Sequence, residues 1–422
     1  MVSTALDKVR SDLTLRRLAQ FEEPEPNYTQ LQHEAWRHLR LVSHGLLVDN
    51  AHSAYQHGIS LIDMPVDYAP QTSFIDEKLN SVDFGAMGVN GFIPSKAFMG
   101  LQLHSIAPMS TDVRDPEYIG YTPSPDRWHE GFGHTIMLAD PRYRRMIKLF
   151  GELGLRAKPS PEDDVYYDAT RHLSILAADS TTTQEQNDRA YEIWSQANEA
   201  AHRAASDARR LSALHWFTIE FGVDNETHNP LLWGAALFSS LSEGRQFKTR
   251  NLQPFSLKTA EAQYNITQQQ ETLYVTKTLD HVIDVLEEFR HTMGSPDPKG
   301  LESITKPAER THAPQQTRER NHLNLIYQCM RACRKESLSS AQLPTLWKAL
   351  KKRHPYDVLC PLGILEQLVK YSLNPDVQDE IRSTLPSIPP YIEGRNEKDT
   401  LEKREGAHQA IADRLALLDE AA

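Results

Sequence analysis

Two stretches of the chain decide its fold and its chemistry: YTPSPDRWHEGFGH at residues 121–134 and HWFTIEFGV at residues 215–223. The first contains His129 and His134, and the second contains Glu220 within a run of aromatic and aliphatic residues. A carboxylate in such a run is costly to bury unless it is paired or binds a metal. Two imidazoles and one carboxylate from a distant segment would form the ligand set of non-heme Fe(II) oxygenases, which leaves coordination positions open.

The spacing of His129 and His134 requires an irregular backbone if both side chains are to bind the same metal ion. Five residues turn an ideal α-helix by about 140°, so both side chains reach one face only where the helix begins or is distorted. Pro125 ahead of the pair and Gly131 and Gly133 between them permit such a distortion.

Two other interpretations of this segment stay open at this point. Two nearby histidines are, without further context, more often ordinary core or surface residues than metal ligands. A metal-dependent hydrolase could use the same histidines with Glu130 as general base. That class carries His-Glu-x-x-His, however, and here the second histidine comes one residue later.

Composition argues against nucleic-acid-binding, membrane-spanning and secreted classes of protein. The 422 residues carry a formal charge of −11 and their basic residues are not gathered into one stripe, which argues against nucleic acid as a partner. No stretch reaches the roughly 18 apolar residues of a membrane span, and the N-terminus lacks the apolar core of a secretory signal. The three cysteines suit a reducing compartment, so we expect a cytoplasmic protein.

Both motifs resemble the two iron motifs of the pterin-dependent aromatic amino acid hydroxylases, the phenylalanine, tyrosine and tryptophan hydroxylases. That family carries Tyr-Thr-Pro-Glu-Pro-Asp, then His-Glu-Leu-Leu-Gly-His, and later Tyr-Trp-Phe-Thr-Val-Glu-Phe-Gly. The resemblance extends over about residues 28–295 and keeps its spacing over long stretches. It implies Fe(II) held by His129, His134 and Glu220, with a tetrahydropterin as electron donor, O2 as co-substrate and a free aromatic amino acid as substrate.

The resemblance also implies which residues contact the pterin. The segment VNGFIPSKAF at residues 89–98 resembles the family's pterin loop. Gly91 and Ile93 fall on loop positions that contact the pterin, and Phe98 falls on the aromatic that stacks against its ring. Glu130, next to the first iron ligand, falls on the carboxylate that lines the pterin side of the iron.

A second group of residues falls on the family's amino acid pocket. Arg114 matches the arginine that binds the substrate carboxylate, and Thr122 and Pro125 match residues lining the pocket. Trp216 matches an aromatic of the ring pocket. Ser239 matches the serine that orients the first histidine ligand and touches the substrate. Taken singly, these positions would be interpreted as core aromatics, a surface ion pair or a helix cap.

Three positions depart from the family pattern. Gly131 replaces a leucine, Pro108 stands where a pterin-pocket histidine is common, and His215 stands where a tyrosine is usual. These departures affect which pterin the protein binds and the shape of its substrate pocket.

We therefore expect a mainly α protein with few short strands. An aromatic amino acid hydroxylase-like catalytic domain would occupy residues 1–295, beginning with a helix within 1–27 and including a segment, 156–206, without a counterpart in the family. A Pro-rich, polar linker would follow at 296–319. Residues 320–422 would form a small helical domain that self-associates or docks on the catalytic domain.

Apolar periodicity places the main helices of the catalytic domain. It predicts one helix from Pro125 to about Leu153 and another from about Gln184 to Phe221, with further helices near 231–241 and 279–293.

The side chains of the ring pocket favour phenylalanine as substrate. Trp216 leaves less room for an indole than the phenylalanine usual in tryptophan hydroxylases. Ile266 falls near a position where tyrosine hydroxylases place an aspartate, and it offers no partner to a phenol, which costs about 1–3 kcal/mol when buried. Tryptophan or tyrosine hydroxylation in a specialised biosynthetic pathway is the alternative.

Overall fold

The computed structural model describes residues 50–114, 125–178 and 182–304 and, of residues 4–43, all but 31, 34, 38, 41 and 42. The predicted helical domain at 320–422 therefore lies outside the described residues.

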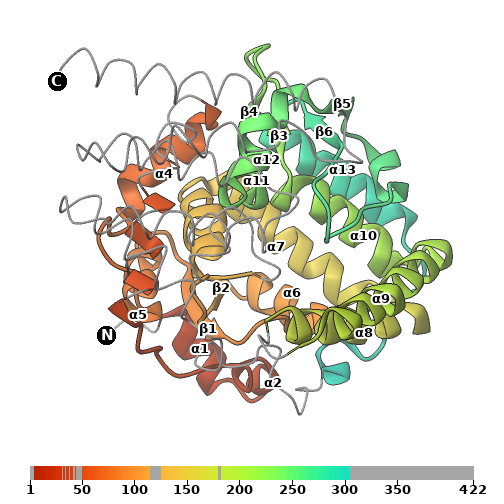
Figure 1. Cartoon of the computed structure of the whole chain (residues 1–422), viewed down its shortest axis with the longest axis horizontal. Coiled ribbons are helices and arrows are strands. Elements are labelled where there is room, and N and C mark those ends of the chain that lie inside the picture. The colour runs from red at the N-terminus through yellow and green to blue at the C-terminus, as the bar shows by residue number, and fades with distance from the viewer. Residues whose placement is uncertain are drawn as a thin grey trace, which may run out of the picture. The chain divides into compact units, whose positions relative to one another are not determined.

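Within these ranges the chain is mostly helical, as predicted (Figure 1). The longer helices are α4 (Ser53–Ile62), α5 (Thr72–Asn80), α6 (Ser95–Leu103), α7 (Pro141–Arg156), α8 (Pro161–Ala178), α9 (Gln184–Ala204), α10 (Asp207–His215) and α13 (Leu279–Thr292). The shorter ones are α1 (Ala5–Ser11), α2 (Arg16–Ala19), α11 (Ala235–Ser239) and α12 (Leu241–Gln246). Two π-helical turns are η2 (His129–Thr135) and η4 (Trp216–Glu220), and 3₁₀ turns are η3 (Ile136–Ala139), η5 (Phe247–Thr249), η6 (Leu257–Glu261) and η7 (Gly300–Ser303).

The strands are short and form two small sheets. Strands β1 (Gly85–Val89) and β2 (Ile106–Ser110) pair in parallel and are buried along their whole length. The second sheet has the order β4 (Leu231–Leu232), β3 (Val223–Asp224), β6 (Thr272–Thr276) and β5 (Asn251–Pro254). Strand β3 begins three residues after Glu220, so this sheet holds the end of the second motif in place.

Helix α7 packs against α6, α10 and α13. Its start is defined by Asp140, whose side chain accepts a hydrogen bond from the Arg142 N–H at 2.8 Å, and by Pro141 in the first turn. Apolar residues at helical spacing, including Tyr143, Met146 and Phe150, are fully buried. The apolar face of this amphipathic helix is therefore buried, and the helix supports the site.

Two predicted long helices are interrupted. The helix expected over 125–153 is instead the turns η2 and η3, a break at Asp140, and then α7. The helix expected over 184–221 ends at Ala204, because Ala205 adopts a left-handed conformation (φ 47°) and Ser206 caps the start of α10. Periodicity missed both breaks because apolar residues continue through them.

The predicted helix at 231–241 is also wrong in its first part. Residues Leu231–Leu232 form strand β4, and only Ala235–Ser239 form the helix α11. The expected helix near 279–293 is confirmed as α13.

Residues 156–206 contain a helical hairpin. Helices α8 and α9 lie side by side in Figure 1 and pack on each other through Ala169, Trp194 and Ala197. The indole N–H of Trp194 donates to the Thr170 hydroxyl at 3.1 Å, which satisfies the one polar atom of this small core. Ile266, from outside the hairpin, also packs against this cluster.

Residues 296–304 are not a linker, contrary to the sequence prediction. Leu301 and Ile304 pack in a cluster with Leu18 and Leu101, and Ile304 is buried. Lys96 on α6 forms an ion pair with Asp297. Apolar burial and this ion pair hold the segment on the catalytic domain, although its composition is polar and Pro-rich.

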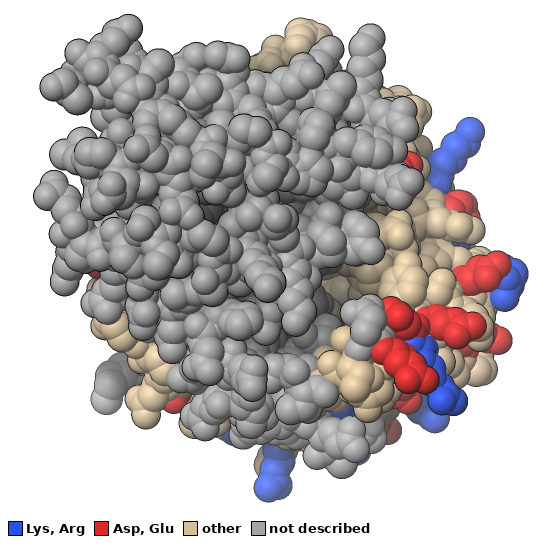
Figure 2. All heavy atoms as spheres, in the orientation of Figure 1, with Lys and Arg blue, Asp and Glu red and all other residues tan. Residues whose placement is uncertain are grey.

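None of the helices in the described ranges is long and apolar enough to cross a membrane. On the face shown in Figure 2, acidic and basic side chains are interspersed where described residues are in view.

The approach of α4 to the histidine segment gives a test of packing. A Cβ on Gly58 would lie 2.1 Å from the carbonyl oxygen of Ile136 in η3. Glycine to alanine usually stabilises a helix interior by about 1 kcal/mol, but Gly58→Ala should lower the free energy of unfolding by about 1–3 kcal/mol through overpacking. Urea titration measures this, with Ser60→Ala on the exposed face of α4 as control; equal stability of the two variants would contradict the packing.

Candidate metal centre and its cavity

A π-helical turn brings His129 and His134 of the first motif to the same side of the helix. Element η2 begins at His129 and contains His134. A π-helix bonds residue i to residue i+5, which brings side chains five positions apart toward the same side. The two Nε2 atoms lie 3.0 Å apart. The distortion expected from the spacing is therefore present.

Glu220 ends the second π-helical turn, η4, and faces both imidazoles. Its Oε2 lies 3.3 Å from the Nε2 of His129, and its Oε1 lies 3.3 Å from the Nε2 of His134. Metal–ligand bonds of about 2.1 Å at angles near 90–105° separate neighbouring ligand atoms by about 3.0–3.3 Å. The three side chains therefore fit one metal ion, and their nitrogen and oxygen donors suit iron.

Hydrogen-bond partners at the Nδ1 atoms of His129 and His134 leave the two Nε2 atoms to face a metal ion. The Ser239 hydroxyl lies 2.8 Å from the Nδ1 of His129 and donates its own proton to the carbonyl of Ala236. It must therefore accept from Nδ1–H, which leaves Nε2 with a free lone pair. On the other ligand, the Tyr143 hydroxyl lies 3.3 Å from the Nδ1 of His134. Nothing in the sequence pattern singled out Tyr143, which lies nine residues away on another helix.

The charge states of Glu220, Glu130 and His215 follow from their burial and their charged neighbours. Burial alone would raise the pKa of the Glu220 carboxyl, but the two imidazoles outweigh it and hold this pKa well below its usual range. Burial, which the charge of His134 only partly offsets, raises the pKa of Glu130 to about 8. Burial lowers the pKa of His215 to about 4, so His215 is neutral at neutral pH. Glu220 is thus the anionic member of the group.

A cavity of about 1130 Å³ opens onto the three ligands. Ligand pockets commonly measure about 300–1,000 Å³, so this one has room for two small molecules. Most of the predicted site residues line it: His129, His134, Glu220, Glu130, Gly91, Ile93, Phe98, Pro125 and Trp216. Gly91 has a φ of 56°, a left-handed conformation that favours glycine in this loop.

Arg114 lies outside the set of described residues that line the cavity. Its Nε and Nη2 donate to the two carboxylate oxygens of Asp126 at 2.9 and 2.8 Å, and its Nη1 donates to the Ser239 carbonyl at 2.8 Å. Asp126 also accepts from the His129 N–H at 3.0 Å. Arg114 therefore joins the first motif to α11. Thr122, the other predicted contact, lies outside the described residues.

The sequence interpretation missed several residues of the cavity. Tyr166 and Tyr167 from α8 and Arg209 from α10 line it, and the Tyr167 hydroxyl donates to the carbonyl of Phe92 at 3.1 Å. The α8–α9 hairpin thus reaches the predicted pterin loop. Asp126 could have been found, because it belongs to the first motif; the hairpin residues could not, because they belong to neither motif.

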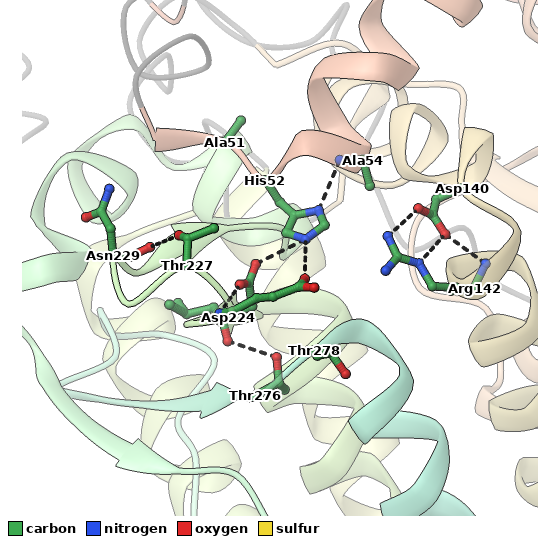
Figure 3. Close-up of polar contacts among 12 residues, drawn as sticks. Ala51, His52, Ala54, Asp140, Arg142, Asp224, Thr227, Asn229, Thr276 and Thr278 are labelled. Atoms are coloured by element: carbon green, nitrogen blue, oxygen red, sulfur yellow. Dashed lines mark hydrogen bonds and ion pairs between the residues drawn. The ribbon is translucent and has the colours of Figure 1, made fainter.

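A second group of possible ligands lies apart from this centre, formed by His52, Asp224 and Glu226 (Figure 3). The Nε2 of His52 is 3.4 Å from Asp224 and 3.9 Å from Glu226. Its Nδ1 accepts the Ala54 N–H at 3.0 Å, so the ring proton is on Nε2 and points at the carboxylates. The group therefore brings the start of α4 close to β3.

The fold and the centre together define a class, a mostly helical enzyme with a two-histidine, one-carboxylate metal site. The chain matches the family model of the biopterin-dependent aromatic amino acid hydroxylase over residues 20–192 and 156–322. It belongs to that family, as its motifs predicted. The metal-dependent hydrolase interpretation is thereby wrong.

Individual relatives are distant. The chain is 24% identical over 276 residues to the phenylalanine 3-hydroxylase of Streptomyces coeruleorubidus, covering 64% of this chain and 82% of that one. It is 25% identical over 248 residues to a phenylalanine-4-hydroxylase of Ralstonia nicotianae, covering 57% and 65%. The crystal structure of Chromobacterium violaceum phenylalanine hydroxylase with iron(III) and 7,8-dihydrobiopterin matches with 21% identity and a TM-score of 0.51, covering 67% and 92%. That likeness shows the fold.

The hydrogen bond behind His129 can be tested with adjacent serines. Ser239→Ala removes the acceptor that selects the imidazole tautomer and should weaken Fe(II) binding about 10- to 100-fold. Ser240→Ala is the matched control, because the Ser240 hydroxyl is buried without a hydrogen-bond partner. Iron titration of both purified variants measures the difference, and equal affinities would show that Ser239 does not orient the ligand.

Proposed function

We propose that the protein hydroxylates the ring of a free aromatic amino acid, phenylalanine in preference to the others, using Fe(II), a tetrahydropterin and O2. The observation that carries the proposal is the Glu220 carboxylate held between the imidazoles of His129 and His134 at the end of a large cavity. Membership of the hydroxylase family and relatives named for phenylalanine hydroxylation support it.

In this proposal the three ligands hold iron on one face and leave the other face to reactants. Bound together, iron and a reduced pterin supply the activation of O2, for which protein side chains have no equivalent. The chain itself supplies placement and exclusion of water. Phe98, Gly91 and Ile93 line the cavity and would contact the pterin ring, and Glu130, next to the ligand His129 in the chain, lines the same cavity.

The preference for phenylalanine depends on two side chains of the cavity. The Trp216 ring stacks on Tyr264 with centroids 5.0 Å apart, and its Nε1 donates to Gln270 at 3.2 Å. A ring held in this way does not move aside for an indole. Ile266 also lines the cavity, and its apolar side chain favours an unsubstituted phenyl ring over a phenol.

The amino acid end of the substrate is assigned from the family pattern. Arg114 would bind the carboxylate, with Thr122, Pro125 and Ser239 close to it. The Asp126 carboxylate holds the Arg114 guanidinium in a fixed orientation.

The cytoplasmic location and the self-association of residues 320–422 are also part of the proposal. The three cysteines and the apolar positions of the C-terminal segment support them.

The reaction is tested by supplying Fe(II)-loaded protein with tetrahydropterin and, in turn, phenylalanine, tyrosine and tryptophan. We expect the highest kcat/KM for phenylalanine, and loss of both iron binding and turnover in Glu220→Ala. Product analysis then tells a 3-hydroxylated from a 4-hydroxylated ring. A tryptophan kcat/KM about tenfold above that of phenylalanine, about 1.4 kcal/mol of transition-state preference, would refute the Trp216 argument, and full turnover in Glu220→Ala would refute the metal centre.

The role of Arg114 is tested by Arg114→Lys, which keeps the charge but loses the planar fork. We expect the KM for phenylalanine to rise at least tenfold, with a smaller change in kcat. Phenylalaninamide, which lacks the carboxylate, should be a poor substrate of the unchanged protein. If the amide reacts as well as the acid, Arg114 does not recognise a carboxylate; a melting curve of the variant shows whether its fold is intact.

A further inference from the structure

Arg209 is a buried cation on the wall of the cavity. It belongs to the first turn of α10, and its guanidinium lies between the rings of Tyr166 and Tyr264, with its carbon 4.5 Å from each ring centroid. The residue is only 5% exposed, yet it lines the cavity together with both tyrosines. Two aromatic faces stabilise a guanidinium by cation–π attraction and hold it flat.

The polar neighbours of Arg209 do not neutralise it. Its Nη2 donates to the Asn198 side-chain oxygen at 2.6 Å and lies within 3.0 Å of the His202 ring nitrogens. Burial and the charge of Arg209 lower the pKa of His202 to about 4, and burial raises the pKa of Tyr264 well above its usual range. Both neighbours are therefore neutral at neutral pH, and the group carries one full positive charge.

Arg209 forms no ion pair in the described part of the chain, and Asp163 is the acidic residue whose charge helps to raise its pKa. Asp163 also lines the cavity, but its carboxylate accepts from the Ser206 hydroxyl and the Ser160 N–H, at 2.6 and 2.7 Å, and forms no ion pair with Arg209. The Nε–H of Arg209 is buried without a hydrogen-bond partner. A buried charge is costly unless it is paired, so an anion from a ligand would complete this group.

The position of Arg209 points to the pterin side of the cavity. Helix α10 runs from the Arg209 end to His215, whose ring packs edge-on against Phe98 with centroids 6.0 Å apart. Six residues of α-helix span about 9 Å. A ligand with its ring on Phe98 would therefore need a tail that extends along α10 to place a group beside Arg209. The Tyr167–Phe92 hydrogen bond puts the hairpin at the same end of the cavity.

We propose that the natural cofactor is a reduced pterin with an anionic tail, and that Arg209, between Tyr166 and Tyr264, binds the carboxylate or phosphate of that tail. This inference rests on the pterin dependence of the proposed function and adds the chemistry of the cofactor's far end. It assigns the α8–α9 hairpin, which supplies Tyr166, Asn198 and His202, to cofactor recognition.

Binding of stable dihydropterins to the full chain, measured by calorimetry without turnover, tests the inference. The probes are dihydrofolate, with a carboxylate tail, a dihydroneopterin phosphate, with a phosphate tail, and dihydrobiopterin, with an uncharged tail. We expect at least one anionic probe to bind tenfold or more tighter than dihydrobiopterin, and the stronger of the two identifies the anion.

Arg209→Gln should remove this preference and leave dihydrobiopterin affinity within about twofold. Arg209→Lys, which keeps a charge for the case in which the glutamine variant does not fold, should retain part of it. Arg210→Gln is the matched control, because the neighbouring guanidinium binds Glu261 and Asp207 and does not line the cavity. Equal affinity for charged and uncharged tails in the unchanged protein, or an equal loss for all three probes in Arg209→Gln or Arg209→Lys, would overturn the inference.

Turnover separates this inference from the proposed function. Hydroxylation supported equally by tetrahydrofolate and tetrahydrobiopterin would refute the anionic tail while leaving the hydroxylase intact. No hydroxylation with any reduced pterin would refute the hydroxylase itself.

Discussion

Burial of one carboxylate between two imidazoles is the interaction on which the rest of the site depends. Glu220 lines the cavity within 3.3 Å of both His129 and His134, and a buried negative charge is stable only beside positive charge or a metal ion. Two turns that depart from regular α-helix bring these three side chains together. The turn η2 brings histidines five positions apart to one side, and the turn η4 aims Glu220 at them. π-Helical turns are rare and occur mostly at functional sites, because regular α-helix is otherwise the more stable choice.

The surrounding scaffold holds these turns from behind. Helix α11 approaches η2 so closely that a Cβ on Gly133 would lie 2.7 Å from that of Ala235, and this contact lets Ser239 of α11 reach His129. The buried Arg114–Asp126 pair joins the same two segments, since Asp126 accepts from the His129 backbone and Arg114 donates to the Ser239 carbonyl. Each group satisfies polar atoms of its neighbour, so these hydrogen bonds orient His129 from behind.

The α8–α9 hairpin lies between the two motifs in the sequence and forms part of the cavity wall. Its helices pack around Trp194 in a small cluster to which Ile266 also contributes, and Tyr166 and Tyr167 line the cavity. Helix α10 connects this wall to the metal centre, because it carries Arg209 in its first turn and leads directly into η4 and Glu220. Residues that belong to neither motif therefore line the same cavity as the metal ligands.

The sequence by itself determined the family, the mainly helical fold and the three side chains that meet at the metal centre, because these depend on short motifs whose residue types have few other uses together. It did not determine where helices break: Ala205 turns left-handed within an apparently continuous helical pattern. Nor did it show that residues 296–304 pack on the domain, or that Arg209 lies between two tyrosines. Those features come from contacts between residues far apart in the chain, and only the tertiary structure decides which apolar surfaces and which charges become neighbours.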